Sequence, residues 1–170
     1  MDRANDFISV LKFAQTYKNV LPNSEILTAE SHGAEGALIA AAPNNPTSQP
    51  DGLNINLIAV TYPGCGYAGL DNLFGNPQGG TWKLGSTPLY SLTGDSDTTT
   101  PYAECSQRQT TAETTWSISS TMLNFAKFPG ATHAFMGTYD TQANIAARAM
   151  AIQEIGKLMD AAKAGKAKIP

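Results

Sequence analysis

Three residues whose types work together in nucleophilic catalysis occur far apart in the chain: Ser31, Asp97 and His133. A serine hydroxyl is a weak nucleophile until a neighbouring base takes its proton. An imidazole base in turn needs a fixed tautomer, which a carboxylate can impose. A serine, a histidine and an aspartate brought together would therefore support acyl transfer through a covalent intermediate.

Ser31 lies in the segment 29–33, which fits a sharp turn between a strand and a helix. In such a nucleophile elbow, small residues two before and two after the serine let the turn close without clashes, and Ala29 and Gly33 occupy those positions. The alternative is that Ser31 merely caps a helix that begins near His32, which is a common use of serine. From this segment alone, both interpretations stay open.

The other two residues have equally plain alternatives. Asp97 lies in the turn 94–101, whose Asp, Ser and Gly residues can bond their own backbone without any catalytic role. His133 lies in the segment 128–135, and a lone histidine on a loop is more often an ordinary loop residue. The catalytic interpretation is stronger for the three residues together than for each alone, because they follow one another in the order Ser, Asp, His, at spacings of 66 and 36 residues.

The apolar pattern along the chain alternates between strands and helices. The predicted strands cover 26–29, 55–62, 88–93 and 122–128, and the predicted helices cover 2–18, 34–42, 102–111 and 141–162. The expected apolar stripe of the last helix comprises Ile145, Ala149, Ile152, Ile155, Leu158 and Met159. This alternation indicates a three-layer α/β fold with about four parallel strands flanked by helices. Each reactive segment directly follows a strand, at the edge where parallel sheets collect their functional loops.

Composition restricts the classes of function. The chain has 170 residues, among which 11 Lys and Arg stand against 14 Asp and Glu. It contains no run of three basic residues, so it lacks the positive charge with which proteins contact the phosphates of nucleic acids. No apolar stretch approaches the roughly 20 residues that span a bilayer. Two cysteines and two histidines are too sparse for a structural zinc site. We therefore expect one globular domain over 1–170, with no nucleic acid partner, membrane span, metal or organic cofactor.

A literal G-x-G-x-x-G occurs at 64–69, after a predicted strand, and suggests a dinucleotide site. Such a site also needs a helix after the glycines and an acidic residue about 20 positions further on. The following segment 71–80 is rich in Gly, Asn and Pro, and no Asp or Glu lies between Asp71 and Asp95. The pattern is therefore interpreted as a loop.

Taken together, the segments 62–65, 94–101 and 129–135 resemble the loops of the dienelactone hydrolase-like family of the α/β-hydrolase superfamily. The similarity runs from the first predicted helix to the last. It implies that Ser31 is the nucleophile, His133 the general base and acid, and Asp97 the orienting carboxylate, since Asp97 lies four residues before Pro101 as in the family's turn. The reaction implied is hydrolysis of a carboxylic ester or lactone, a small-molecule substrate, although the small founding members use a cysteine where this chain has Ser31.

The resemblance also implies how the oxyanion is held. His32 follows the nucleophile, so its backbone N–H is expected to point into the oxyanion hole. A second donor is expected from a loop after an earlier strand, and nothing in 1–18 supplies it. A non-catalytic or incomplete module is therefore a second hypothesis, and an acyltransferase or peptidase on the same scaffold is a third.

Set against the fold that it resembles, a chain of 170 residues is short. We expect a truncated domain in which the earlier half of the sheet is absent. The strand that ends near Ala29 would then be an exposed apolar edge, through which the chain could associate with itself.

Two further features acquire a meaning from the same resemblance. Cys65 and Cys105 are each expected just beyond the end of one of two neighbouring strands, so they form either a disulfide or two unpaired loop thiols. A disulfide would favour a periplasmic or secreted origin; otherwise the compartment stays open. The candidates for the wall of a substrate pocket are Tyr67, Leu70, Phe74, Trp82 and Trp116. The alternative is that these side chains simply pack over the edge of the sheet.

Overall fold

The computed structural model describes residues 2–20, 25–41, 55–66, 87–137 and 140–164. In chain order its elements are α1 (Asp2–Ala14), β1 (Glu25–Glu30), α2 (Ser31–Ala41), β2 (Ile55–Thr61), β3 (Leu89–Gly94), α4 (Tyr102–Trp116), β4 (Leu123–Phe128) and α5 (Gln142–Lys163). The strands form one sheet in the order β1-β2-β3-β4, and each neighbouring pair is parallel. The predicted α/β fold with four parallel strands is confirmed.

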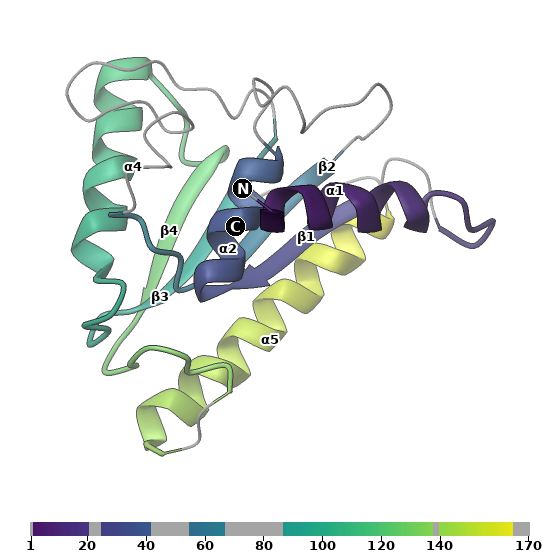
Figure 1. The fold of residues 1–170 in the computed structure, drawn as a ribbon. Coiled ribbons are helices and arrows are strands. Elements are labelled where there is room, and N and C mark those ends of the chain that lie inside the picture. The colour runs from purple at the N-terminus through teal and green to yellow at the C-terminus, as the bar shows by residue number, and fades with distance from the viewer. Residues whose placement is uncertain (1, 21–24, 42–54, 67–86, 138–139, 165–170) are drawn as a thin grey trace.

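Helices cover both faces of this sheet (Figure 1), which makes three layers. On one face α2 and α4 share a core with Ile58 and Val60 of β2, and α1 packs over α2. On the other face α5 packs against Leu57 and Ala59 of the same strand. Because both faces of β2 are buried, its sequence is a nearly continuous apolar run, as is typical of a parallel sheet.

The register of the strands sets which loops meet at their carboxyl ends. Glu30 pairs with Thr61, so the chain leaves β1 at Ser31 directly beside the point where it leaves β2 at Tyr62. Gly94 pairs with Phe128 in the same way, so the loops that follow β3 and β4 begin side by side. The three reactive segments therefore start from one edge of the sheet.

Within the described ranges, β1 and β4 are the two outer strands of the sheet, and no strand pairs with the outer edge of β1. Leu27 is buried, whereas Thr28 and Glu30 on this strand are exposed. The sequence predicted an exposed apolar edge, whereas the exposed side chains of this strand, Thr28 and Glu30, are polar.

Three helix boundaries differ from the prediction. The first helix ends at Ala14 instead of residue 18, and Tyr17 is exposed. The second begins at Ser31 instead of Ala34, directly after the strand. α4 continues to Trp116 instead of residue 111, because Ala112 packs into the core while the polar side chains around it hide this periodicity in the sequence.

The predicted apolar stripe of α5 is buried only in part. Leu158 is buried and Ile155 packs against the core, whereas Ile145, Ile152 and Met159 are 41–55% exposed and Ala149 is exposed too. The buried face consists of Asn144, Ala147, Ala151, Leu158 and Ala162. Small alanine side chains let the helix lie close to the sheet, so the closest contacts come from the residues with the weakest apolar signal. Among the described helices, none is both long and apolar enough to cross a membrane.

Candidate active site at the carboxyl end of the sheet

Ser31 stands at the junction of β1 and α2, where the chain turns sharply. Its φ of 50° lies in the left-handed region, which a residue with a side chain seldom adopts. A Cβ placed on Gly33 would meet the Ala29 side chain at 3.9 Å, an ordinary van der Waals contact, so alanine at position 29 leaves room for the turn. The strained turn presents the Ser31 side chain above the end of the strand.

His133 reaches Ser31 from the loop after β4. The Ser31 Oγ and His133 Nε2 atoms lie 2.9 Å apart, although 102 residues separate the two along the chain. The His133 side chain is 22% exposed, and the residue that follows it, Ala134, has a φ of 59°. The imidazole therefore sits within hydrogen-bonding distance of the serine while one part of it still meets solvent.

Asp97 completes the arrangement from the loop after β3. The His133 Nδ1 lies 2.8 Å from Asp97 Oδ2, and this carboxylate is fully buried. Its other oxygen, Oδ1, accepts the backbone N–H groups of Thr99 at 2.8 Å and Thr100 at 2.9 Å. An ionised carboxylate at Nδ1 favours the tautomer that has its proton there, which leaves Nε2 free to accept the serine proton.

The pKa of Asp97 is lowered from its ordinary value, although burial acts against this. Burial alone raises the pKa, because it disfavours the charged form. The backbone N–H of Thr100, the imidazole of His133, the Thr100 hydroxyl and the Thr99 N–H all bind the carboxylate form and outweigh that effect. Asp97 is therefore kept ionised in a buried position.

Asp95, the other carboxylate of this turn, bonds the backbone of the loop after β4. Its Oδ1 accepts the backbone N–H of Gly130 at 2.6 Å, and the Ser96 N–H donates to the carbonyl of Ala131 at 3.0 Å. These bonds join the loop after β3 to the loop after β4. Asp95 thus helps to hold together the two loops that carry Asp97 and His133.

Sequence reasoning missed Thr100, which organises the acid side of the site. Its hydroxyl oxygen lies 2.8 Å from Asp97 Oδ2, 3.2 Å from His133 Nδ1 and 3.2 Å from the carbonyl oxygen of Tyr62. The available signal was that Thr100 lies in the same turn as Asp97, in which an aspartate side chain bonds the backbone that follows it.

His32 follows Ser31 in the first turn of α2. The first N–H groups of a helix have no intrahelical acceptor, so the backbone N–H of His32 can serve an oxyanion. The side chain is 70% exposed and its Nε2 lies 3.4 Å from Glu35 Oε2. Burial raises the pKa of Glu35, and the nearby His32 and Arg3 partly offset this.

A disulfide joins Cys65, in the loop after β2, to Cys105 on α4. Both residues are buried in the core beneath α2 and α4. Arg108, one turn further along α4, donates from Nε to the carbonyl of Cys65. The loop that begins at Tyr62 is therefore fixed to α4 by a covalent bond and a hydrogen bond.

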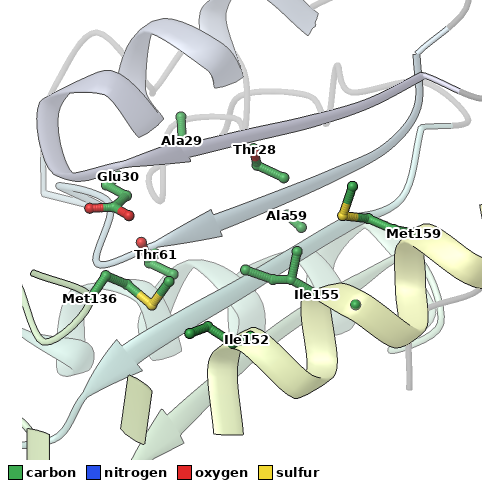
Figure 2. A pocket seen from close by; sticks show the side chains of 10 residues that line it. Thr28, Ala29, Glu30, Ala59, Thr61, Met136, Ile152, Ile155 and Met159 are labelled. Carbon is green, nitrogen blue, oxygen red and sulfur yellow. The ribbon is translucent and has the colours of Figure 1, made fainter. Parts of the chain in front are cut away.

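A cavity of about 430 Å³ lies between the sheet and α5, under the outer edge of β1. Figure 2 shows Glu30, Thr61 and Met136 at one end and Met159 at the other, with Ile152 and Ile155 of α5 along one side. Ser31 is not among its lining residues. The cavity is thus separate from the serine hydroxyl, although Glu30 adjoins both.

The proposed pocket-wall residues Tyr67, Leu70, Phe74 and Trp82 lie outside the described residues, and so does the side chain of Trp116 in α4. Among the residues described, no group of three or more His, Cys, Asp or Glu side chains is placed to hold a metal ion.

No protein-family model matches the sequence, and no curated protein matches it. Solved structures do resemble the fold. The carboxylesterase Cest-2923 from Lactobacillus plantarum is 13% identical, with a TM-score of 0.62, and the match covers 96% of this chain and 66% of that one. An alpha-beta serine hydrolase homologue from Coxiella burnetii is 18% identical, with a TM-score of 0.55 and coverages of 87% and 56%.

Thermogutta terrifontis esterase 2, in a structure phosphorylated by paraoxon, is 16% identical, with a TM-score of 0.55 and coverages of 90% and 62%. At these identities the likeness shows the fold, which is an α/β-hydrolase fold. The chain spans between 56% and 66% of the length of these three structures.

Proposed function

We propose that the chain is a serine hydrolase of carboxylic esters or lactones, with Ser31 as nucleophile, His133 as base and acid, and Asp97 as the orienting carboxylate. The observation that carries this proposal is the continuous chain of hydrogen bonds, 2.9 Å from Ser31 Oγ to His133 Nε2 and 2.8 Å from His133 Nδ1 to Asp97 Oδ2. Both distances lie within the reach that proton transfer requires.

In the proposed reaction, His133 Nε2 takes the Ser31 proton as the serine oxygen attacks the substrate carbonyl. The negative charge that develops on the carbonyl oxygen is stabilised by the N–H of His32. The same proton then passes from His133 to the leaving alcohol oxygen, and an acyl-enzyme remains. In the second half, His133 takes a proton from a water molecule as the water oxygen attacks the acyl carbon. The bond between this carbon and Ser31 Oγ then breaks, His133 donates the proton to Oγ, and the carboxylic acid is released.

The finer assignment to the dienelactone hydrolase-like family is part of this proposal. Its support is the sequence of the segments 62–65, 94–101 and 129–135, which lie at the carboxyl ends of β2, β3 and β4. The esterases among the similar structures favour an ester as substrate over an amide. An acyltransferase or peptidase would use the same three residues, because the acceptor is chosen by the surrounding loops.

A fluorophosphonate probe tests the proposal, since such probes react with activated serines. We expect the wild-type chain to be labelled and Ser31→Ala not to be labelled. Ser9→Ala is the matched control, because Ser9 is an exposed serine on α1 whose hydroxyl donates to the Asn5 carbonyl at 2.8 Å. Equal labelling of wild type and Ser31→Ala would refute the assignment, and so would a wild-type chain that is not labelled.

One observation favours a second candidate, an incomplete module that does not turn over. Within the described residues the sheet stops at β1, so no strand on the far side of Ser31 supports a loop with a second oxyanion donor. Removal of one such donor lowers kcat by about 10²–10³-fold. Labelling at Ser31 without turnover of p-nitrophenyl acetate would support this candidate, whereas labelling with turnover would support the hydrolase.

A further inference from the structure

Backbone strain singles out a residue that the proposed mechanism does not use. Among the described residues, four that are not glycine have a left-handed φ: Ser31 (50°), Tyr62 (39°), Ala134 (59°) and Ser117 (55°). Ser117 ends α4. Ser31 is the proposed nucleophile and Ala134 follows the proposed base. Strained residues of this kind persist only where the surroundings hold them, and they gather at functional sites. Tyr62 is the strained residue that still lacks a role.

Tyr62 makes a separate contact toward each of the three loops of the site. Its hydroxyl donates to Glu30 Oε2, on the residue directly before Ser31. Its ring meets the imidazole of His133 edge to face, with the ring centroids 4.9 Å apart and an interplanar angle of 61°. Its carbonyl oxygen lies 3.2 Å from the hydroxyl of Thr100, which in turn contacts the Asp97 carboxylate.

The surroundings fix Tyr62 in this position. The residue is 2% exposed, its N–H donates to the Leu92 carbonyl of β3 at 2.8 Å, and its ring also packs on Phe135 with centroids 5.1 Å apart. Burial raises the pKa of the Tyr62 hydroxyl, and the hydrogen bond to Glu30 raises it further. The phenol therefore keeps its proton over the whole pH range in which an ester hydrolase works. Its hydroxyl can donate a hydrogen bond to Glu30 throughout that range.

We propose that Tyr62 is a positioning residue that fixes the loops of Ser31, Asp97 and His133 relative to one another through its hydroxyl, its carbonyl and its ring. This inference rests on the proposed function, because it assigns the three loops to one site. It goes beyond that function because Tyr62 supplies no proton or nucleophile. It explains why a bulky aromatic residue adopts a left-handed conformation directly after a buried strand.

Different parts of the side chain have separable tasks. The hydroxyl anchors Glu30 and with it the end of β1 from which Ser31 projects. The ring edge limits rotation of the imidazole, so that Nε2 faces Ser31 and Nδ1 faces Asp97. A displacement of about 1 Å between reacting groups can lower a rate by about 10²-fold. Loss of the ring should therefore slow the reaction more than loss of the hydroxyl alone.

The test uses two variants and a matched control. Tyr62→Phe removes the hydroxyl and keeps the ring, and Tyr62→Leu removes both. Tyr102→Phe is the control, because the Tyr102 hydroxyl is also partly buried and donates to a backbone carbonyl, that of Phe125, at 3.0 Å on α4. Two readouts are followed: the rate of fluorophosphonate labelling, and the NMR signal of the proton shared by His133 Nδ1 and Asp97, which needs no catalysis.

We expect Tyr62→Phe to keep the proton signal and to be labelled about tenfold more slowly. For Tyr62→Leu we expect labelling to slow by about 10²-fold and the proton signal to broaden through exchange with water. With p-nitrophenyl acetate, kcat should fall in both variants while KM stays unchanged. Tyr102→Phe should leave labelling, kcat and the proton signal as in the wild type, whatever it does to the melting temperature.

The proposal is overturned if Tyr62→Phe is labelled as fast as Tyr102→Phe, or if folded Tyr62→Leu keeps both the proton signal and the labelling rate. Should Tyr62→Leu fail to fold, as seen by circular dichroism, Tyr62→Phe alone decides. If the wild type is not labelled, the proposed function fails, and the proton signal in Tyr62→Leu still tests whether Tyr62 positions His133.

Discussion

The side-chain amide of Asn144, on α5, holds the backbone and the hydroxyl of Thr132, the residue directly before His133. Asn144 Oδ1 accepts the Thr132 N–H at 2.9 Å, and Asn144 Nδ2 donates to Thr132 Oγ1 at 2.9 Å. Asn144 is fully buried and also receives support from Asp140 and Thr141, at the start of its helix. α5 therefore fixes the loop of the proposed base, although it contributes no residue to the proposed reaction.

Replacement of Asn144 should loosen that loop. In Asn144→Ala, the partly buried N–H of Thr132 loses its acceptor, which costs up to about 1–3 kcal/mol. We expect a lower free energy of unfolding by that amount, measured in urea, together with slower fluorophosphonate labelling because His133 is held less firmly. Gln142→Ala, an exposed change in the first turn of the same helix, should alter neither quantity. If Asn144→Ala lowered stability but left the labelling rate intact, the link to His133 would be wrong.

The lowered pKa of Asp97 predicts how stability responds to acid. Since the folded pKa lies below the value of an unfolded chain, about 3.9, the ionised carboxylate stabilises the fold fully above that value. This contribution is lost as the pH falls through the lowered folded pKa. The free energy of unfolding of the wild type should therefore fall more steeply below about pH 4 than that of Asp97→Asn.

Asp6→Asn is the control for this comparison, because it removes the same charge from an exposed position on α1. Its stability should fall with acid as the wild type's does. Parallel acid curves for wild type and Asp97→Asn, from urea unfolding at several pH values, would contradict the role of the buried carboxylate.

The disulfide between Cys65 and Cys105 closes a loop of 40 residues in the sequence. A cross-link of that span stabilises by about 4 kcal/mol, through the restricted unfolded chain. We expect dithiothreitol to lower the urea midpoint of the wild type and to leave that of the double variant Cys65→Ser, Cys105→Ser unchanged. Detection of two free thiols in the unreduced protein would show that the pair does not form.

The elements and the reactive residues could be predicted from sequence for one reason. Ser31, Asp97 and His133 each follow a strand that the apolar pattern of the sequence predicts, and such a pattern is local. Parallel strands bring their carboxyl ends to one edge whatever the loop lengths between them. The fold prediction is confirmed, and the roles of the three residues stay a prediction.

The contacts of Tyr62 could not be predicted, because they depend on long-range register. Its hydroxyl bonds Glu30, 32 residues away, only since Glu30 and Thr61 are paired across β1 and β2. A left-handed φ at a tyrosine also has no sequence signal, unlike one at glycine or asparagine. The buried face of α5 escaped prediction for a different reason: its core residues are mostly alanines, while Ile152 and Met159 are exposed.

The outer edge of β1, which no described strand pairs with, should promote self-association. An unpaired edge strand offers backbone N–H and C=O groups to another chain, and a lysine there discourages such pairing. We expect sedimentation velocity to show association that increases with concentration, and Thr28→Lys, at an exposed position of β1, to reduce it. Thr110→Lys, exposed on α4 at the other side of the sheet, is the control and should associate as the wild type does. A wild-type chain that stays monomeric at every concentration would exclude association at this edge.

Two glycines give opposite predictions for the same substitution. A Cβ on Gly94 would overlap the backbone carbonyl oxygen of Ala131, and so would force apart the loops that carry Asp97 and His133. Apart from its chain neighbours and the helix backbone, no atom lies within 4 Å of a Cβ placed on Gly156, inside α5. Gly94→Ala should therefore lower the urea midpoint and slow labelling by about 10²-fold, as a 1 Å displacement does. Gly156→Ala should raise stability by about 0.5–1 kcal/mol, because alanine is the better helix former. Equal stability of the two variants would show that the contact between Gly94 and Ala131 does not hold the loops together.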